Sequence, residues 1–196
     1  MKILFVSSEC APFSKSGGLA DVAFSLPPAL QKTGDDMAIV TPMYRVTQEN
    51  YGDEFERIKT CQIVLGQRRL ACSLYRGALN GVTVYAIGNE HLFHRPRLYG
   101  YGDDSLRFAF FCRAVIDLLP EFGDLPDILH CNDWETALAI LYLKNDAVLR
   151  PELSHIKTVY TIHNIAYQGQ FGRSEMEATF ALPDGWYHGG LSYEFE

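Results

Sequence analysis

The feature that most constrains the fold of this 196-residue sequence is a series of four short apolar runs with helical patterns between them. The runs are nearly uninterrupted, as in strands covered on both faces of a sheet, and they lie at residues 3–6, 37–40, 128–131 and 159–162. Apolar side chains recur at helical spacing over residues 19–26, 106–118 and 137–141. Strands that alternate with helices predict an α/β domain with a Rossmann-like, doubly wound and mostly parallel sheet.

Two adjacent prolines, Pro27 and Pro28, follow directly on the first helical pattern. Each proline lacks the N–H that a helix needs, and its ring clashes with the preceding turn. We therefore expect the first helix to be kinked or broken at this point.

The segment from residue 58 to residue 87 has a different pattern, with three strand-like runs separated by polar residues. Asn80 and Gly81 lie between the last two runs, and Asn-Gly is the strongest short-range signal for a hairpin because a type I′ turn needs positive φ at both central residues. The sequence therefore predicts a β-meander inserted in, or appended to, the α/β core.

Composition narrows the classes of function. The sequence is 47% hydrophobic and 13% aromatic, so it can build a core without disulfides, and its net charge of −7 leaves no broad basic face for nucleic acid. The first apolar run is too short for a membrane span or a signal peptide. Five cysteines without a C-x-x-C pair favour reduced thiols in the cytoplasm.

Metal-ligating residues are sparse. His91 and His94 are three residues apart and His130 precedes Cys131, but no further ligands converge at the spacing of a metal site. We expect no metal and no cofactor.

A glycine loop follows the first predicted strand. It carries Lys15, then Gly17 and Gly18, and then a helical pattern. Backbone N–H groups at a helix N-terminus bind anions, glycines allow close approach, and a lysine adds charge, so a nucleotide-sugar diphosphate fits this loop. A tight strand-to-helix turn with a solvated lysine explains the same residues. The lysine precedes the glycines, which is the order of neither the dinucleotide-binding fingerprint nor the P-loop.

Polar residues also follow the third predicted strand. Asn132 and Glu135 have the spacing of an N-cap and its reciprocal acid, which would leave Asp133 free for another task. Asp133 would either stabilise the helix N-terminus by its charge or bind a ligand at the carboxyl end of the strand.

His163 lies at the end of the fourth predicted strand, and hydrogen-bonding residues and a glycine follow it. A sugar pocket needs such groups, although a histidine satisfied by neighbouring backbone has the same sequence. A glycine-rich stretch before the second long helix adds Tyr99, Tyr101, Asp103 and Asp104, which suit sugar faces and hydroxyls but are equally ordinary loop residues.

Three motifs, in this order and spacing, resemble those of bacterial glycogen synthases and plant starch synthases over nearly the whole chain. They are KSGGLADV at residues 15–22, HCNDWETA at residues 130–137 and TIHNIAYQG at residues 161–169. In that family the first motif usually begins K-T-G-G-L, so Ser16 keeps the hydroxyl and loses a methyl group.

The resemblance implies the N-terminal half of a GT-B glycosyltransferase, in which two Rossmann-like domains face a cleft. Such an enzyme transfers glucose from ADP-glucose to the non-reducing end of an α-1,4-glucan with retention. A retaining transfer without an evident protein nucleophile would depend on electrostatic stabilisation of the departing diphosphate and of the sugar cation.

The resemblance also implies roles for individual residues. On the donor side, Lys15, Gly17 and Gly18 would contact the phosphates and the adjoining sugar, and His163 with Asn164 would contact the glucose.

On the acceptor side, or near the reacting sugar, the resemblance implies Asp21, Tyr101 and Asp133. His163 and Asp133 are the predicted catalytic residues.

Family members are more than twice as long as this chain, so we expect residues 1–196 to be one truncated N-terminal domain without its C-terminal nucleotide-binding partner. By itself it would be inactive. A non-catalytic glucan-binding or regulatory module of the same fold remains the alternative. A nicotinamide-binding domain is a third interpretation, but the glycine loop lacks the three-glycine spacing it needs.

Overall fold

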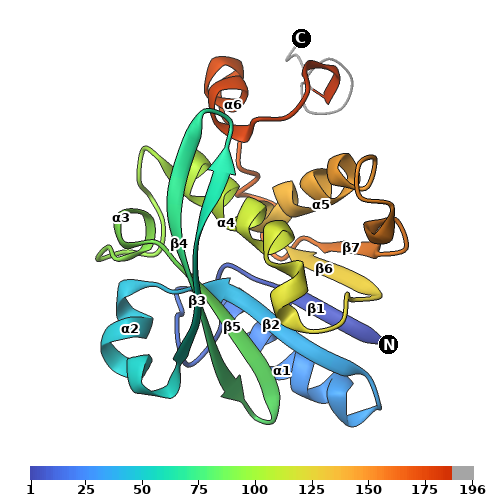
Figure 1. The fold of residues 1–196 in the computed structure, drawn as a ribbon. Helices are drawn as coiled ribbons and strands as arrows, with labels where there is room; N and C mark the ends of the chain where they lie inside the picture. The colour runs from blue at the N-terminus through green and yellow to red at the C-terminus, as the bar shows by residue number, and fades with distance from the viewer. Residues whose placement is uncertain (187–196) are drawn as a thin grey trace.

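The computed structural model describes residues 1–186, which form seven strands in one sheet with helices on both sides (Figure 1). The strands are β1 (Lys2–Val6), β2 (Asp36–Pro42), β3 (Glu56–Leu65), β4 (Arg68–Leu79), β5 (Val82–Gly88), β6 (Ile128–Asn132) and β7 (Lys157–Thr161). Their order across the sheet is β3-β4-β5-β2-β1-β6-β7. The predicted α/β architecture is confirmed.

Six α-helices and four short 3₁₀ turns lie between or after the strands within residues 1–186. The helices are α1 (Gly18–Lys32), α2 (Arg45–Tyr51), α3 (Glu90–Phe93), α4 (Asp104–Asp117), α5 (Trp134–Asp146) and α6 (Arg173–Phe180). The 3₁₀ turns are η1 (Gly52–Glu54), η2 (Leu119–Phe122), η3 (Pro151–Leu153) and η4 (Asp184–Trp186). All three predicted helices are present as α1, α4 and α5.

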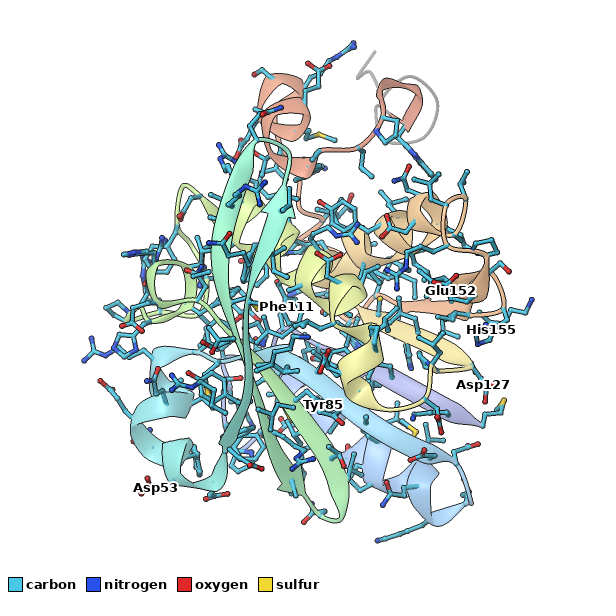
Figure 2. All side chains as sticks on the ribbon, in the orientation of Figure 1. Asp53, Tyr85, Phe111, Asp127, Glu152 and His155 are labelled. Atoms are coloured by element: carbon cyan, nitrogen blue, oxygen red, sulfur yellow. The ribbon has the colours of Figure 1, made fainter. Side chains whose placement is uncertain are left out.

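Two apolar cores fill the two faces of the sheet. On one face α4 and α5 pack over the strands, and Phe111 of α4 is completely buried in the middle of the molecule, whereas the exposed Asp53 and His155 lie at its periphery (Figure 2). On the other face α1 packs Ala23 against Phe5 and Ile39. Layers on both faces explain why β1 is apolar at four of its five positions.

The five strands β5, β2, β1, β6 and β7 are parallel. The chain moves outward from β1 to β2 and β5 on one side, and then crosses to β6 and β7 on the other. The topological switch point is therefore between β1 and β6. In open sheets of this type, ligands bind outside the carboxyl ends of the strands at that point.

The predicted β-meander is confirmed as β3, β4 and β5. Asn80 and Gly81 join the last two strands with φ of 50° and 85°, the positive values that a type I′ turn requires. The meander extends the parallel sheet, because β5 pairs in parallel with β2. It thus occupies the edge of the sheet opposite β7.

A break at Pro27 and Pro28 does not occur: α1 is one helix that continues through both residues. Both prolines are buried, and they lie on the face of α1 that also buries Leu19, Ala20 and Ala23. Burial of two apolar rings against the sheet offsets the two lost backbone hydrogen bonds. Tertiary packing here overrides the local preference of proline.

The fourth predicted strand is only partly covered. Val159 and Tyr160 in β7 are 41% and 42% exposed, and Ile162, which follows the strand, is 54% exposed. The expectation that this run is buried on both faces is wrong for residues 1–186, because β7 is the edge strand and α5 covers little of it. No helix of the described residues is long and apolar enough to cross a membrane.

We predict that the uncovered apolar residues around β7 cause self-association. Sedimentation velocity over a range of concentrations should show reversible oligomers, and Ile162→Thr combined with Ile165→Thr should shift the distribution toward monomer. Val46→Thr is the matched control, since Val46 is a single exposed apolar residue at 39% exposure on α2. A wild-type chain that stays monomeric at high concentration would contradict the prediction.

Candidate functional site

The carboxyl ends of β1, β6 and β7 are joined by one buried side chain, that of Asn132. Its Nδ2 donates to the backbone oxygen of Val6, at the end of β1, over 3.0 Å. Its Oδ1 lies 2.9 Å from Nε2 of His163, just after β7. Asn132 is completely buried, so it ties three strand ends together at the switch point.

Asn132 is therefore not the predicted N-cap. It is the last residue of β6, the N-cap of α5 is Asp133, and no side chain caps this helix. The reciprocal acid, Glu135, is buried, and one of its oxygens, Oε2, has no hydrogen-bond partner among residues 1–186. The spacing of a capping box was present, but Asn132 lies between the ends of β1 and β7, where its amide finds partners in Val6 and His163 instead of the helix.

The hydrogen bonds of Asn132 also determine which ring nitrogen of His163 carries the proton. Nδ2 of Asn132 faces the carbonyl oxygens of Val6 and His130, which only accept, so Oδ1 must face the histidine. Nε2 of His163 therefore donates to Asn132. In the neutral ring Nδ1 is then the acceptor, and His163 itself is exposed.

Asp133 adopts a backbone conformation that non-glycine residues rarely take, with φ of 58° and ψ of 173°. Its N–H donates to the Thr161 oxygen of β7 over 2.9 Å. Its Oδ1 accepts the N–H of His163 at 2.7 Å and that of Asn164 at 3.3 Å. The carboxylate thus holds the loop after β7 against the end of β6, and the structure brings three predicted site residues together.

The glycine loop lies after β1, beside this cluster in the sheet. Nζ of Lys15 contacts both carboxylate oxygens of Asp21 at 2.6 and 2.8 Å, with both side chains more than half exposed. An exposed pair of this kind contributes less than about 1 kcal/mol, so an anion can displace Asp21. A Cβ built on Gly17 or Gly18 would meet no atom of the described residues within 4 Å.

Glu9 is the residue of this loop to which sequence reasoning gave no role. Its Oε2 accepts the N–H groups of Ser16 and Gly17 at 2.5 and 3.1 Å. Its Oε1 accepts the hydroxyls of Ser16 and Tyr99 at 2.6 and 2.9 Å. Two of the N–H groups expected to bind an anion are therefore already occupied by a carboxylate of the chain.

Tyr101 and Tyr99 come from the same loop but lie in different surroundings. The Tyr101 hydroxyl accepts the N–H of Arg97, and the guanidinium of Arg107 lies 4.8 Å from the centre of its ring. Tyr99, in contrast, reaches Glu9 and Ser8. Within residues 1–186, no hydrogen bond or ring contact joins Tyr101 to the cluster of Asp133 and His163.

Gly169 in the loop after β7 has a purely structural reason to be glycine. Its φ is +62°, and a Cβ there would lie 2.5 Å from the ring of Trp134, the first residue of α5. The close approach packs the loop onto the helix that begins beside Asp133.

Burial changes the acid–base properties of two residues under the site. Burial raises the pKa of Glu135 to about 8, and the neighbouring charges of Asp133 and Glu9 act in the same direction. Burial also lowers the pKa of His130, and the nearby His163 adds to this effect. At neutral pH Glu135 is thus mostly protonated. In the described residues no three His, Cys, Asp or Glu side chains are grouped as a metal site.

Comparison with known proteins connects this geometry to one family. Residues 2–195 match the model of the starch synthase catalytic domain. A glycogen synthase of Geobacillus thermodenitrificans is 43% identical over 189 residues, which are 95% of this chain and 38% of that protein. A glycogen synthase of Clostridium novyi is 42% identical over 174 residues, 88% of this chain and 36% of the relative.

A solved structure shows the same fold. The catalytic domain of starch synthase IV from Arabidopsis thaliana, bound to ADP and acarbose, superposes with a TM-score of 0.81 at 30% identity, over 94% of this chain and 38% of that one. The chain thus spans less than two fifths of each of these three proteins. Its mostly parallel sheet with flanking helices is the fold found in starch synthases.

The backbone of Asp133 yields a stability prediction. Strain at such φ and ψ values costs on the order of 1–3 kcal/mol in a residue with a Cβ. Asp133→Gly and Asp133→Ala both lose the carboxylate, but only glycine relieves the strain. We expect the glycine variant to be more stable by about 1 kcal/mol in urea unfolding, the reverse of the usual order. An alanine variant of equal or greater stability would contradict this.

The pKa of Glu135 predicts a pH dependence. The folded state holds its proton up to about pH 8, while the unfolded chain releases it near the ordinary value of 4.5, so the contribution of Glu135 to stability falls as pH rises between these values. Glu135→Gln should be nearly neutral at pH 4.5 and stabilising by on the order of 2–4 kcal/mol at pH 8.

Urea unfolding of both proteins across this range measures the effect. The difference between the two free energies of unfolding at each pH removes the contributions that both proteins share, including that of His130. Glu152→Gln is the control, because that side chain is 56% exposed. A difference that does not change with pH would show that Glu135 is not buried as a neutral acid.

Proposed function

Because the chain belongs to the family of starch synthase catalytic domains, we propose that it forms the N-terminal, sugar-facing domain of a two-domain glucosyltransferase. The complete enzyme transfers glucose from ADP-glucose to the non-reducing end of an α-1,4-glucan, with retention at the anomeric carbon. In this proposal the nucleotide-binding wall of the cleft belongs to a C-terminal domain, as the resemblance to the family implies, and this chain spans 38% of its Geobacillus thermodenitrificans relative.

The observation that carries the proposal is the open space at Gly17 and Gly18. Neither glycine has positive φ, and a Cβ on either would meet no atom of residues 1–186 within 4 Å. The described part of the fold therefore gives no reason for glycine at the start of α1. A ligand that approaches this backbone closely would be a reason for glycine, and a phosphate is the ligand expected at a helix N-terminus.

The donor site follows from this placement. Lys15 exchanges its weak pairing with Asp21 for the diphosphate of ADP-glucose, and the N–H of Gly18 faces the same group. Within residues 1–186, the Gly18 N–H has no hydrogen-bond acceptor, unlike the N–H groups of Ser16 and Gly17. The solved starch synthase IV is bound to ADP and acarbose, a nucleotide and a sugar-like molecule, which suits this pair of subsites.

The glucose lies over the ends of β6 and β7. With Nε2 of His163 held by Asn132, Nδ1 is the atom that receives a glucose hydroxyl proton in a hydrogen bond. Asn164 contacts the same sugar. Asp133 lies on the acceptor side, close to the anomeric carbon, where a fixed carboxylate stabilises developing positive charge.

Asp21, once released from Lys15, and Tyr101 contact the glucan acceptor. Tyr101 would act from the rim of the cleft, because its contacts are with arginines of its own loop and of α4. Catalysis combines orientation of the sugar with electrostatic stabilisation and needs no cofactor. We also propose a reducing cytoplasm as its location, since all five cysteines are free thiols.

Glucosyl transfer tests the proposal. The chain joined to the C-terminal part of the glycogen synthase of Geobacillus stearothermophilus, a 43% identical relative, should transfer glucose from ADP-glucose to glycogen. The 196-residue chain alone should not, since its cleft has one wall. A joined enzyme that binds glycogen without turnover would instead favour the glucan-binding or regulatory module.

Two variants of the joined enzyme separate the predicted roles. Lys15 meets a charge present both before and during transfer, so Lys15→Gln should raise the KM for ADP-glucose more than it lowers kcat. His163→Ala should lower kcat by on the order of a hundredfold, because a misplaced ring raises the chemical barrier. Unchanged donor KM in the first variant, or unchanged kcat in the second, would show that the assignment is wrong.

A further inference from the structure

Glu9 is the buried acid with the most complete set of hydrogen bonds at this site. Each of its oxygens accepts two, so four donors surround one carboxylate that is 3% exposed. Buried carboxylates are costly unless their acceptor sites are filled, and here they are filled by two N–H groups and two hydroxyls. Groups of the chain itself thus satisfy this carboxylate completely, and the proposed reaction gives Glu9 no role that would explain the arrangement.

The four donors come from two separate segments. Ser16 and Gly17 supply three of them, from the residues between Lys15 and the start of α1. Tyr99 supplies the fourth, and because its single hydroxyl proton is donated to Glu9, Ser8 donates in turn to Tyr99. Glu9 therefore clamps the glycine loop to the end of β1 and to the loop before α4.

The clamp determines which atoms of the loop remain available to bind ADP-glucose, the sugar donor. Ser16 and Gly17 direct their N–H groups inward to Glu9, so these cannot meet a diphosphate. Gly18 and Lys15 lie on either side of the clamped pair, Gly18 is exposed, and the Lys15 side chain is more than half exposed. The loop is thereby held in one conformation before any ligand binds, which lowers the ordering cost of binding.

We propose that Glu9 is a positioning residue for the donor loop, which fixes Lys15 and the Gly18 N–H for the diphosphate without touching the substrate. This inference rests on the proposed function for its ligand, but the clamp itself is a property of the chain. The hydroxyl of Ser16 belongs to the clamp and not to the donor site. Either serine or threonine supplies that hydroxyl.

The clamp is tested on the 196-residue chain by NMR. In wild type, the Ser16 and Gly17 amide protons should be shifted downfield and protected from exchange with solvent. Glu9→Ala should remove both effects, while Glu9→Gln, which retains one acceptor oxygen and the volume, should keep a large part. Glu90→Gln is the matched control, since that side chain is 71% exposed.

Ser16→Ala removes one of the four donors and leaves the carboxylate in place. It should reduce the protection of the Gly17 amide only partly, and it keeps the test decisive if Glu9→Ala does not fold. The clamp would be refuted if both amides remained protected in Glu9→Ala. It would also be refuted if their protection were unchanged in both Glu9→Gln and Ser16→Ala.

Kinetics of the joined enzyme test the positioning role. Glu9→Ala should raise the KM for ADP-glucose by about tenfold, with the KM for glycogen unchanged, and Glu9→Gln should restore most of the donor affinity. A merely structural role would change neither KM selectively. An inactive wild-type enzyme would refute the proposed function while the NMR result still decides the clamp, and equal donor KM in wild type and Glu9→Ala would refute the positioning role alone.

Discussion

The site depends on the hydrogen bonds of Asn132, because this one carboxamide joins the ends of three parallel strands. Its Nδ2 binds the end of β1 and its Oδ1 binds His163 beyond β7, while the residue itself ends β6. An amide offers both a donor and an acceptor, which a carboxylate or a hydrocarbon of the same size does not. The orientation of His163 follows from this linkage, and the neighbouring Asp133 carboxylate holds the loop after β7.

Two buried glutamates show how surroundings decide the role of an acid. Glu9 has four donors around its carboxylate, and it organises the glycine loop. Glu135 lies nearby with one oxygen unpartnered, and burial raises its pKa to about 8. A protonated Glu135 adds no negative charge beneath the site, where Asp133 and Glu9 already lie. The electrostatics of the site thus depend on buried groups as well as on exposed ones.

Much of the fold could be predicted from the sequence, because short apolar runs, helical spacing and the Asn80–Gly81 turn are local signals. Two of the failures share a cause, which is that long-range packing outweighed a local preference. Burial carried α1 through Pro27 and Pro28, and the partners of Asn132 at the ends of β1 and β7 overrode a capping box. The third, the exposure of β7, follows from its place at the edge of the sheet. The role of Glu9 was beyond sequence reasoning, since its partner Tyr99 is 90 residues away.

Glycine illustrates how the needs of the fold can be separated from those of a ligand. At Gly169 the protein itself demands the residue, since φ is positive and the Trp134 ring occupies the place of a Cβ. At Gly17 and Gly18 the backbone is ordinary, and no atom of residues 1–186 occupies the neighbouring space. All three belong to motifs shared with one family, so motif membership alone does not distinguish them. The structure assigns Gly169 to packing, and packing within the described residues does not account for Gly17 and Gly18, which is why we propose a ligand for them.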